Sequence, residues 1–292
     1  MNAIITAATG YTEADLRIFL RSIEQNCKTA KVFLIVFRQD HKSIEKLRQK
    51  YPFVEPIYIR QKVIKKLRRF FVWVAHALKK RDYSQLPLLL QMLGRQPLHI
   101  VVERFFIMSN IVQSHRHIFS NVLLTDCRDV VIQKDPFERL ENQLVSGLEV
   151  KTIASDSLNS YWISSIYGNA IFSAIRDKKI VCAGVTIGTI DAVQHYLDTL
   201  CSEMWNHLPQ ITKLQFGPDQ AAHNYLIYQN KIPCHLVTEQ SGLIATLNLD
   251  HPSDIFKDSV NGCIEINGTC PAILHQYDRY PDLLDFFKHQ YH

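Results

Sequence analysis

The sequence predicts an α/β protein built on a doubly wound, mixed but mostly parallel sheet that is flanked by helices. Two features predict this class. Short apolar runs alternate with amphipathic helical patterns along residues 1–60, which is the βαβ rhythm of a parallel sheet. Farther along the chain, the apolar run Asn121–Thr125 ends directly on acidic residues, and ligands of open α/β sheets bind at the carboxyl ends of the strands.

The elements follow in a regular order. Residues 3–7 and 31–37 are short apolar, β-rich runs, and the segment between them, Glu13–Asn26, has helical spacing with one apolar face. A third strand is expected at Val54–Ile59. The other expected elements are a helix at 100–113, strands at Asn121–Thr125, 153–154 and 181–187, helices at 162–176, 190–205 and 219–228, a short run at 273–279, and a final helix from Pro281.

A single domain is expected over residues 1–292. The chain has 47% hydrophobic and 21% charged residues, a composition typical of a folded protein with one core to bury. Residues 60–98 interrupt the βαβ rhythm with a basic, aromatic helical stretch and then a leucine-rich one. We interpret them as an insertion within that domain.

Cysteine usage and the N-terminus both favour a cytoplasmic protein. The seven cysteines are odd in number and lack Cys-x-x-Cys spacing, so reduced thiols are expected rather than a disulfide framework or a zinc site. The first residues lack the basic and apolar regions of a secretory signal. No window approaches the roughly 18 uninterrupted apolar residues of a membrane span.

The strongest chemical signal is the segment VLLTDCRDVVIQKDPF, in which Asp126 and Asp129 follow the run Asn121–Thr125. Two carboxylates at the mouth of a strand can hold a hard divalent cation and leave positions for diphosphate oxygens and water. Such a cation stabilises the charge that develops on a departing nucleotide diphosphate. Taken alone, the motif has an alternative interpretation as a surface turn.

This segment resembles the D-x-D region of GT-A glycosyltransferases, especially the retaining enzymes typified by family 8. The resemblance implies a GT-A fold, a Mn²⁺ or Mg²⁺ cofactor, and transfer of a hexose from a nucleotide-sugar to an acceptor hydroxyl with retention. The family bias is toward a UDP-sugar. Aligned on the downstream Asp-Pro-Phe, Asp129 takes the place of the second motif aspartate. Asp126 lies one position upstream of the usual first aspartate, so it is either a metal ligand or a ribose contact.

Two further segments match the same family in order. CAGVTIG, at residues 182–188, resembles a strand whose small residues let the backbone approach the donor sugar, which implies that role for Gly184. GPDQAAHN, at 217–224, resembles the D-Q-x-x-x-N helix start. It implies that Asp219 accepts hydrogen bonds from the sugar and that Gln220 lies beside the anomeric carbon. A bulge glycine and a helix-capping aspartate are the structural alternatives.

The C-terminal segment HQYDR, at 275–279, lies where related enzymes supply a histidine as the third metal ligand. The resemblance therefore implies that His275 binds the metal through a neutral imidazole and that Arg279 binds phosphate. Arg104 matches a donor-binding arginine that precedes the metal motif. An ion pair with Glu103 or another acid is the alternative for Arg104.

Two groups of residues complete the implied site. After the first strand, where relatives hold the uridine, the implied donor-binding residues are Thr6, Ala7, Ala8 and Tyr11. Between the metal motif and residue 182, the implied acceptor-binding residues are Asn159, Trp162 and Tyr167. Aromatic rings are common platforms for sugars, but they are equally common in protein cores, and core packing is the alternative for the two rings.

The segment 62–80 combines clustered cations with aromatic and aliphatic residues, and residues 60–81 carry nine Lys or Arg and no acid. It is either a partly buried helix with a solvated basic end or a helix that makes peripheral contact with an anionic membrane. No nucleic-acid-binding motif accompanies it, so a nucleic-acid partner is not expected.

The sequence does not identify the acceptor, which is a glycan, a lipid-linked compound or another hydroxyl compound. Two other functions stay open. A non-catalytic nucleotide-sugar or glycan-binding protein on the same scaffold is one, and the unusual D-x-x-D spacing favours it. A sugar-phosphate nucleotidylyltransferase is the other, although the N-terminus lacks the glycine-rich, basic phosphate loop of those enzymes.

Overall fold

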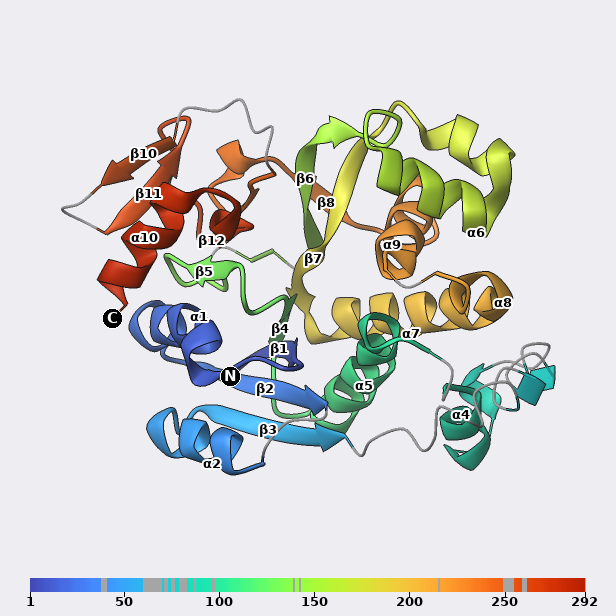
Figure 1. Ribbon diagram of the computed structural model, residues 1–292, viewed down its shortest axis with the longest axis horizontal. Helices are drawn as coiled ribbons and strands as arrows, with labels where there is room; N and C mark the ends of the chain where they lie inside the picture. Colours follow the sequence, from blue (N-terminus) through green and yellow to red (C-terminus); the bar gives the residue numbers. More distant parts are fainter. Residues whose placement is uncertain are drawn as a thin grey trace.

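The main sheet of the computed structural model carries strands in the order β3-β2-β1-β4-β7-β6-β8 (Figure 1). The structure describes residues 1–37, 41–59, 70, 73–74, 77–78, 83–86, 88–95, 98–138, 140–141, 143–214, 216–248, 255–258 and 262–291. The main-sheet strands are β1 (Asn2–Ala8), β2 (Ala30–Phe37), β3 (Val54–Ile59), β4 (Asn121–Thr125), β6 (Leu144–Thr152), β7 (Lys179–Thr189) and β8 (His235–Val237). Strand β7 is antiparallel to both its neighbours, and the remaining pairs are parallel. The expected mixed, mostly parallel α/β sheet is confirmed.

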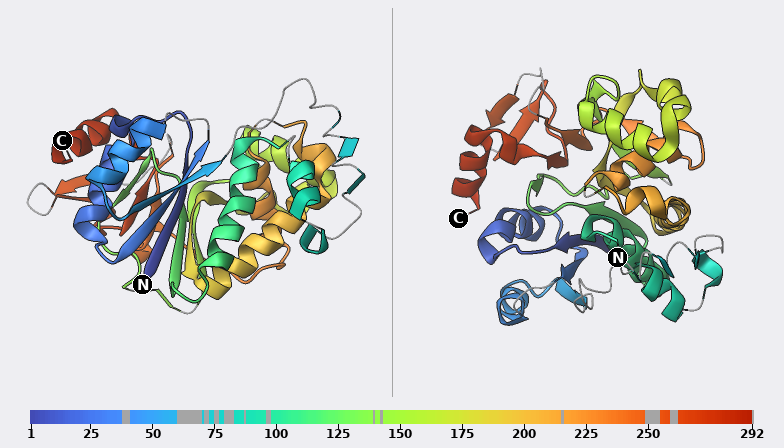
Figure 2. Two further views of the ribbon diagram at one scale, coloured as in Figure 1. Left: turned by 90° about the horizontal axis from the view of Figure 1, so that it is seen from below. Right: turned by 45° about the vertical axis from the view of Figure 1, so that its right-hand side comes forward.

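Helices cover both faces of this sheet, as Figure 2 shows in its left view. Strand β1 explains why, because its alternate residues enter two different cores. Ile4 packs with the apolar face of α1, whereas Ile5 packs with α5 and α7. The described helices are α1 (Glu13–Asn26), α2 (His41–Lys50), α4 (Leu88–Arg95), α5 (Ile100–Ser114), α6 (Ser157–Ile175), α7 (Ile190–Asn206), α8 (Leu208–Ile211), α9 (Pro218–Tyr228) and α10 (Pro281–Gln290).

A small second sheet carries the C-terminal part of the chain to the centre of the molecule. Strand β12 (Ile273–His275) pairs with β5 (Val130–Ile132) on one side and with β9 (Ile244–Thr246) on the other. In this register His275 lies opposite Val130, the residue that follows Asp129. The C-terminal elements then pack beside α1, where Ile18 joins their core (Figure 1). Residues far apart in sequence therefore meet at the end of β4.

Most expected elements of the main sheet are confirmed, including α1, β3 and β4 with the predicted bounds. The prediction of a strand at residues 153–154 is wrong. These residues form the turn that follows β6, a strand that the sequence analysis did not identify. Its first four residues are buried and its last five are only partly buried, so neither a continuous apolar run nor a strict alternation marks it.

The insertion at residues 60–98 lies largely outside the described residues. Helix α4 belongs to it, and the described Phe70 and Trp73 are exposed with their rings stacked on each other. The rest of the basic segment 62–80, apart from residues 74 and 77–78, is outside the described part. Among the described residues, no helix combines the length and apolar character that a membrane crossing requires.

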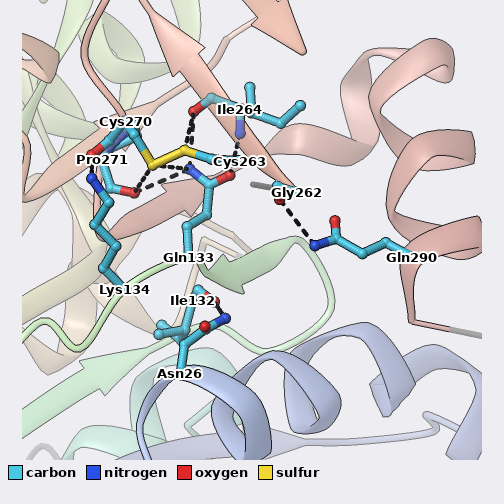
Figure 3. The surroundings of a disulfide bond; sticks show 10 residues. All are labelled: Asn26, Ile132, Gln133, Lys134, Gly262, Cys263, Ile264, Cys270, Pro271 and Gln290. Atoms are coloured by element: carbon cyan, nitrogen blue, oxygen red, sulfur yellow. Dashed lines mark hydrogen bonds between the residues drawn. A yellow bond between two sulfur atoms is a disulfide. The ribbon is translucent and has the colours of Figure 1, made fainter. Parts of the chain in front are cut away.

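A disulfide joins Cys263 to Cys270 (Figure 3), which corrects the expectation that all seven cysteines are reduced. Cys263 opens β11 (Cys263–Ile266), which pairs with β10 (Ile255–Asp258). After β11 the chain reverses through Asn267 and Gly268, which both have positive φ, as two-residue hairpin turns require. The Asn-Gly pair thus brings two cysteines together whose spacing matches no common motif. Figure 3 also shows the amide of Gln133 bonded to Ile264 and Pro271 beside the disulfide.

Candidate functional site

The candidate site forms on the loop that connects β4 to β5. Its backbone is fixed on both sides, since Asp126 N–H donates to Gly184 O at 2.8 Å and Gln276 N–H donates to Asp129 O at 2.7 Å. Within this loop the side chain of Cys127 turns inward and is buried, with its thiol donating to Ala7 O at 3.5 Å. Arg128 turns outward. Because Cys127 points into the interior, Asp126 and Asp129 face the same side of the loop despite the extra residue between them.

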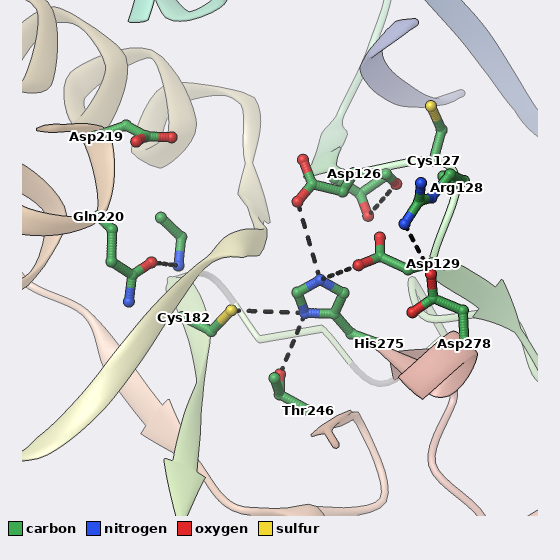
Figure 4. A network of polar contacts seen from close by, with 12 residues as sticks. Asp126, Cys127, Arg128, Asp129, Cys182, Asp219, Gln220, Thr246, His275 and Asp278 are labelled. Carbon is green, nitrogen blue, oxygen red and sulfur yellow. Dashed lines mark hydrogen bonds and ion pairs between the residues drawn. The ribbon is translucent and has the colours of Figure 1, made fainter. Parts of the chain in front are cut away.

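Three side chains meet at this loop in an arrangement that could hold a metal ion. One ligand atom from each of Asp126, Asp129 and His275 lies within 4.8 Å of the other two. His275 Nε2 is 3.7 Å from Asp129 Oδ2 and 3.9 Å from Asp126 Oδ2 (Figure 4). All three residues were predicted as ligands. A carboxylate oxygen of Asp126 lies in the same cluster as that of Asp129, despite the displaced position of Asp126 in the motif.

The surroundings of the His275 imidazole favour a cation between it and the aspartates. The residue is 1% exposed, and its Nε2 has no hydrogen-bond partner. Its Nδ1 lies 3.5 Å from both Thr246 Oγ1 and Cys182 Sγ (Figure 4). A proton on Nδ1 leaves the Nε2 lone pair facing two carboxylates, at separations too long for hydrogen bonds. A divalent cation relieves that repulsion and satisfies the buried nitrogen.

The pKa values of two groups at the cluster are shifted mainly by burial. Burial raises the pKa of Asp129 above its usual value, while the nearby His275 acts in the opposite direction. Burial also raises the pKa of Cys182 well above its usual range, so this residue stays a neutral thiol on the Nδ1 side of the imidazole. The candidate ligand set is therefore two carboxylates and one imidazole, without a thiolate.

Arg104 links the metal cluster to the start of α9. From the first turns of α5, it places Nη1 2.5 Å from Asp126 Oδ1 and Nη2 3.2 Å from Asp219 Oδ2. Burial disfavours the charged guanidinium, but the carboxylates of Asp126 and Asp219 outweigh this effect and raise the pKa of Arg104. Burial raises the pKa of Asp219, and Arg104 counteracts that rise. The predicted donor-binding arginine therefore lies in the site, and the ion pair considered as its alternative is also present.

Gly184 is required by the metal cluster itself. A β-carbon at this position would lie 2.5 Å from Cε1 of His275 and 2.9 Å from Oδ2 of Asp126. Separations below 3.0 Å force a neighbour to move. The structure therefore gives a packing reason for the small size of Gly184, and its approach to a donor sugar stays a prediction. Two predicted ligands pack directly over this glycine.

The side-chain amide of Gln220 forms hydrogen bonds with the backbone of β7. Its Oε1 accepts from Ala183 N–H at 2.9 Å, and its Nε2 donates to Val181 O at 2.9 Å. Asn224, one turn later on α9, accepts from Val181 N–H and also donates to Val181 O, both at 2.9 Å. The Q-x-x-x-N pattern therefore pairs two amides with a stretch of strand backbone, and Gln220 positions the strand that carries Gly184. Its contact with an anomeric carbon stays a prediction.

A cavity of about 340 Å³ opens beside the metal cluster, at the carboxyl ends of β1 and β4. Its volume lies within the range of small-molecule sites, about 300 to 1,000 Å³. The lining residues are Ala7, Thr9, Tyr11, Ile100, Val101, Arg104, Asp126, Cys127, Arg128 and Asp129. Of the predicted nucleotide-binding residues, Ala7 and Tyr11 line this cavity, whereas Thr6 and Ala8 are fully buried behind it. We call it the β1–β4 pocket.

The other predicted contacts lie farther from this pocket. Arg279 is exposed and is not among the described lining residues. Asn159 is buried in the first turn of α6 and donates to the capping Asp156. Trp162 packs against Gly217, and Tyr167 stacks on Tyr225 with 3.9 Å between ring centroids. The two rings thus join α6 to the segment around α9, as the core alternative expected, and their contact with an acceptor stays a prediction.

Several residues of the site were not predicted from the sequence. Thr246 and Cys182 contact the far side of His275, and Arg128 lines the β1–β4 pocket, as do Thr9, Ile100 and Val101. No local pattern marks Thr246, whereas Arg128 stands between the two aspartates of the metal motif. Neither a protein-family model nor a curated protein sequence matches the chain, so the function is argued from the geometry of the site.

Proposed function

We propose that the protein is a metal-dependent glycosyltransferase of the GT-A type, which transfers a hexose from a nucleotide-sugar, most simply a UDP-sugar, to an acceptor hydroxyl with retention. The observation that carries this proposal is the cluster of Asp126, Asp129 and His275 at the rim of the β1–β4 pocket. Metal ligands and a ligand-sized pocket share the carboxyl ends of β1 and β4, the place where open α/β sheets bind nucleotides.

The chain offers a group for each part of such a donor. Asp126, Asp129 and His275 would hold Mn²⁺ or Mg²⁺, which when bound neutralises the charge of a departing nucleoside diphosphate. Tyr11 and Ala7 present an aromatic ring and a small side chain to the nucleoside. Arg104 orients Asp126, and to Asp219 at the start of α9, which pairs with Arg104, we assign the acceptance of hydrogen bonds from sugar hydroxyls.

The acceptor and the partners beyond the donor belong to the same proposal. An acceptor hydroxyl on a glycan, a lipid-linked compound or another molecule completes the reaction. Segment 62–80 would bring the enzyme to an anionic membrane surface, because residues 60–81 carry nine Lys or Arg and no acidic residue. No described feature calls for a nucleic-acid partner.

The test is an assay of the purified protein with a panel of UDP-, GDP- and ADP-sugars, measuring release of the nucleoside diphosphate by hydrolysis or transfer. We expect release from at least one donor with Mn²⁺, and loss of release in excess chelator, because charge on the leaving group must be neutralised. Binding of a nucleotide-sugar without any turnover would favour the non-catalytic alternative. Full turnover in chelator would overturn the metal-dependent proposal.

A further inference from the structure

We propose that Arg128 is a phosphate-binding residue of the β1–β4 pocket, which exchanges its ion pair with Asp278 for the diphosphate of a bound nucleotide. The inference rests on the proposed function and deepens it, because it names the group that meets the donor's diphosphate. It starts from the positions of two arginines in the pocket wall, Arg104 and Arg128.

Arg104 is already committed to other groups. Its side chain is 14% exposed, and its two terminal nitrogens bond to Asp126 and Asp219. Arg128 differs, because its side chain is 56% exposed and its one described ion pair is with Asp278, at 3.1 Å (Figure 4). The Asp278 side chain is 18% exposed, so water reaches this pair mainly from the side of the guanidinium. Of the two pocket arginines, Arg128 is the more exposed and has the fewer described partners, so it is the one that can turn to a ligand.

The charges of the other groups in the pocket leave Arg128 as the source of positive charge for a diphosphate. A divalent cation is neutralised by Asp126 and Asp129, and Arg104 is neutralised by Asp219. A diphosphate entering this pocket thus meets no net positive charge from those five groups. Arg128 supplies the missing charge once it leaves Asp278, and its planar guanidinium suits bidentate contact with phosphate oxygens.

The backbone around Arg128 is held by contacts that do not involve its side chain. The hydroxyl of Tyr277 donates to Arg128 O at 3.1 Å, and Gln276 N–H donates to Asp129 O at 2.7 Å. Cys127, the preceding residue, is anchored in the interior. These contacts hold the base of Arg128 at the pocket wall without requiring its pair with Asp278. A change of partner then needs only side-chain rotation.

Two variants distinguish phosphate binding by Arg128 from a purely structural role of its ion pair with Asp278. If the pair merely ties the His275 segment to the β4–β5 loop, Arg128→Ala and Asp278→Asn remove the same contact and have the same effect. If Arg128 binds phosphate, Arg128→Ala loses the contact, whereas Asp278→Asn frees the arginine. Arg116→Ala is the control for loss of a half-exposed, ion-paired arginine, because Arg116 pairs with Asp191 and does not line the pocket.

The experiment is isothermal titration calorimetry of these full-length proteins with UDP and with inorganic pyrophosphate, both with Mn²⁺ present. We expect Arg128→Ala to weaken both ligands about tenfold, the scale of one lost charge-assisted hydrogen bond. Arg128→Lys should restore part of the affinity, and Asp278→Asn should bind as tightly as wild type or up to a few-fold more tightly. Arg116→Ala should match wild type.

Equal weakening by Arg128→Ala and Asp278→Asn would overturn the inference, as would unchanged binding by a folded Arg128→Ala protein. In either case wild-type binding would persist, so the proposed function would stand. Absence of binding of UDP and pyrophosphate to the wild-type protein would contradict both proposals. Thermal unfolding midpoints, measured alongside, show whether each variant is folded.

Discussion

A β-carbon on Gly184 would lie 2.5 Å from Cε1 of His275, so the strand β7 and the strand β12 can meet only because one of them carries a glycine. We expect Gly184→Ala to displace His275 and to lower Mn²⁺ affinity by at least about tenfold, the scale on which metal sites respond to misplaced ligands. Titration of Mn²⁺ with detection of the free ion by electron paramagnetic resonance measures this directly.

Gly188→Ala is the matched control on the same strand. Its β-carbon would lie 2.8 Å from the backbone oxygen of Gln143, and backbone moves less readily than a side chain. This variant should lower the unfolding midpoint while leaving the Mn²⁺ affinity of the folded fraction unchanged. Wild-type Mn²⁺ affinity in Gly184→Ala would contradict the described packing.

Asp129→Asn should reduce turnover by at least about a hundredfold, which is typical when one major electrostatic contact to a developing charge is lost. The neutral amide keeps the shape of the side chain, so the fold should survive. Steady-state release of nucleoside diphosphate is the measurement, with Asp177→Asn as the control because Asp177 is 91% exposed. Normal turnover with normal Mn²⁺ binding would show that the metal motif has been misassigned.

Gln220→Ala and Asn224→Ala each leave one backbone N–H of β7 without its side-chain acceptor, at Ala183 and Val181 respectively, and each also removes one of the two amide donors to Val181 O. We expect each to lower the free energy of unfolding by about 1 to 3 kcal/mol, the cost of one unsatisfied buried donor. Denaturant unfolding compares the pair. If Gln220 also contacts the donor sugar, Gln220→Ala should lower kcat well beyond Asn224→Ala. Equal losses of kcat would reduce Gln220 to a positioning residue.

Burial of His223 should make the free energy of unfolding fall as the pH is lowered. It is fully buried with Nδ1 2.9 Å from the hydroxyl of Tyr196, and burial lowers its pKa from 6.5 to about 3. Because the unfolded chain binds a proton at higher pH than the fold does, this contribution is complete above about pH 6.5 and is lost as pH falls toward 3. At pH 5 the loss should be about 2 kcal/mol.

Urea unfolding of wild type and His223→Gln between pH 7 and pH 5 tests this. Glutamine can keep a hydrogen bond to Tyr196 but does not titrate, so the difference between the two proteins should shrink as pH falls. A difference that is constant over this range would contradict a neutral, buried His223.

The main sheet could be predicted because its signals are local. The apolar runs at β1, β3 and β4 and the amphipathic pattern of α1 each lie within one element. Strands β5, β9 and β12 have three residues each, too few for a periodic pattern, and they exist through pairing between distant segments. The disulfide depends on the reversal at Asn267 and Gly268, a turn that this Asn-Gly pair marks in the sequence but that the sequence analysis did not use.

The residues of the site also fall into those that the sequence marks and those that only the fold brings into place. Asp126, Asp129 and His275 could be predicted as ligands from chemistry and motif order, and the structure brings them together. The position of Arg128 in the pocket wall could not be predicted, since it depends on Cys127 turning inward so that the neighbouring Arg128 lines the pocket. Thr246 was missed because its contact with His275 arises from the parallel pairing of β9 with β12.

The most direct test of the account is Mn²⁺ binding by His275→Ala beside wild type, because the claim depends on a C-terminal histidine completing a site with Asp126 and Asp129. His289→Ala, at an exposed position on α10, is the control. We expect wild type and His289→Ala to bind Mn²⁺ with equal affinity and His275→Ala to bind at least about tenfold more weakly, with all three folded. Equal Mn²⁺ affinity in His275→Ala and wild type would contradict the three-ligand metal centre.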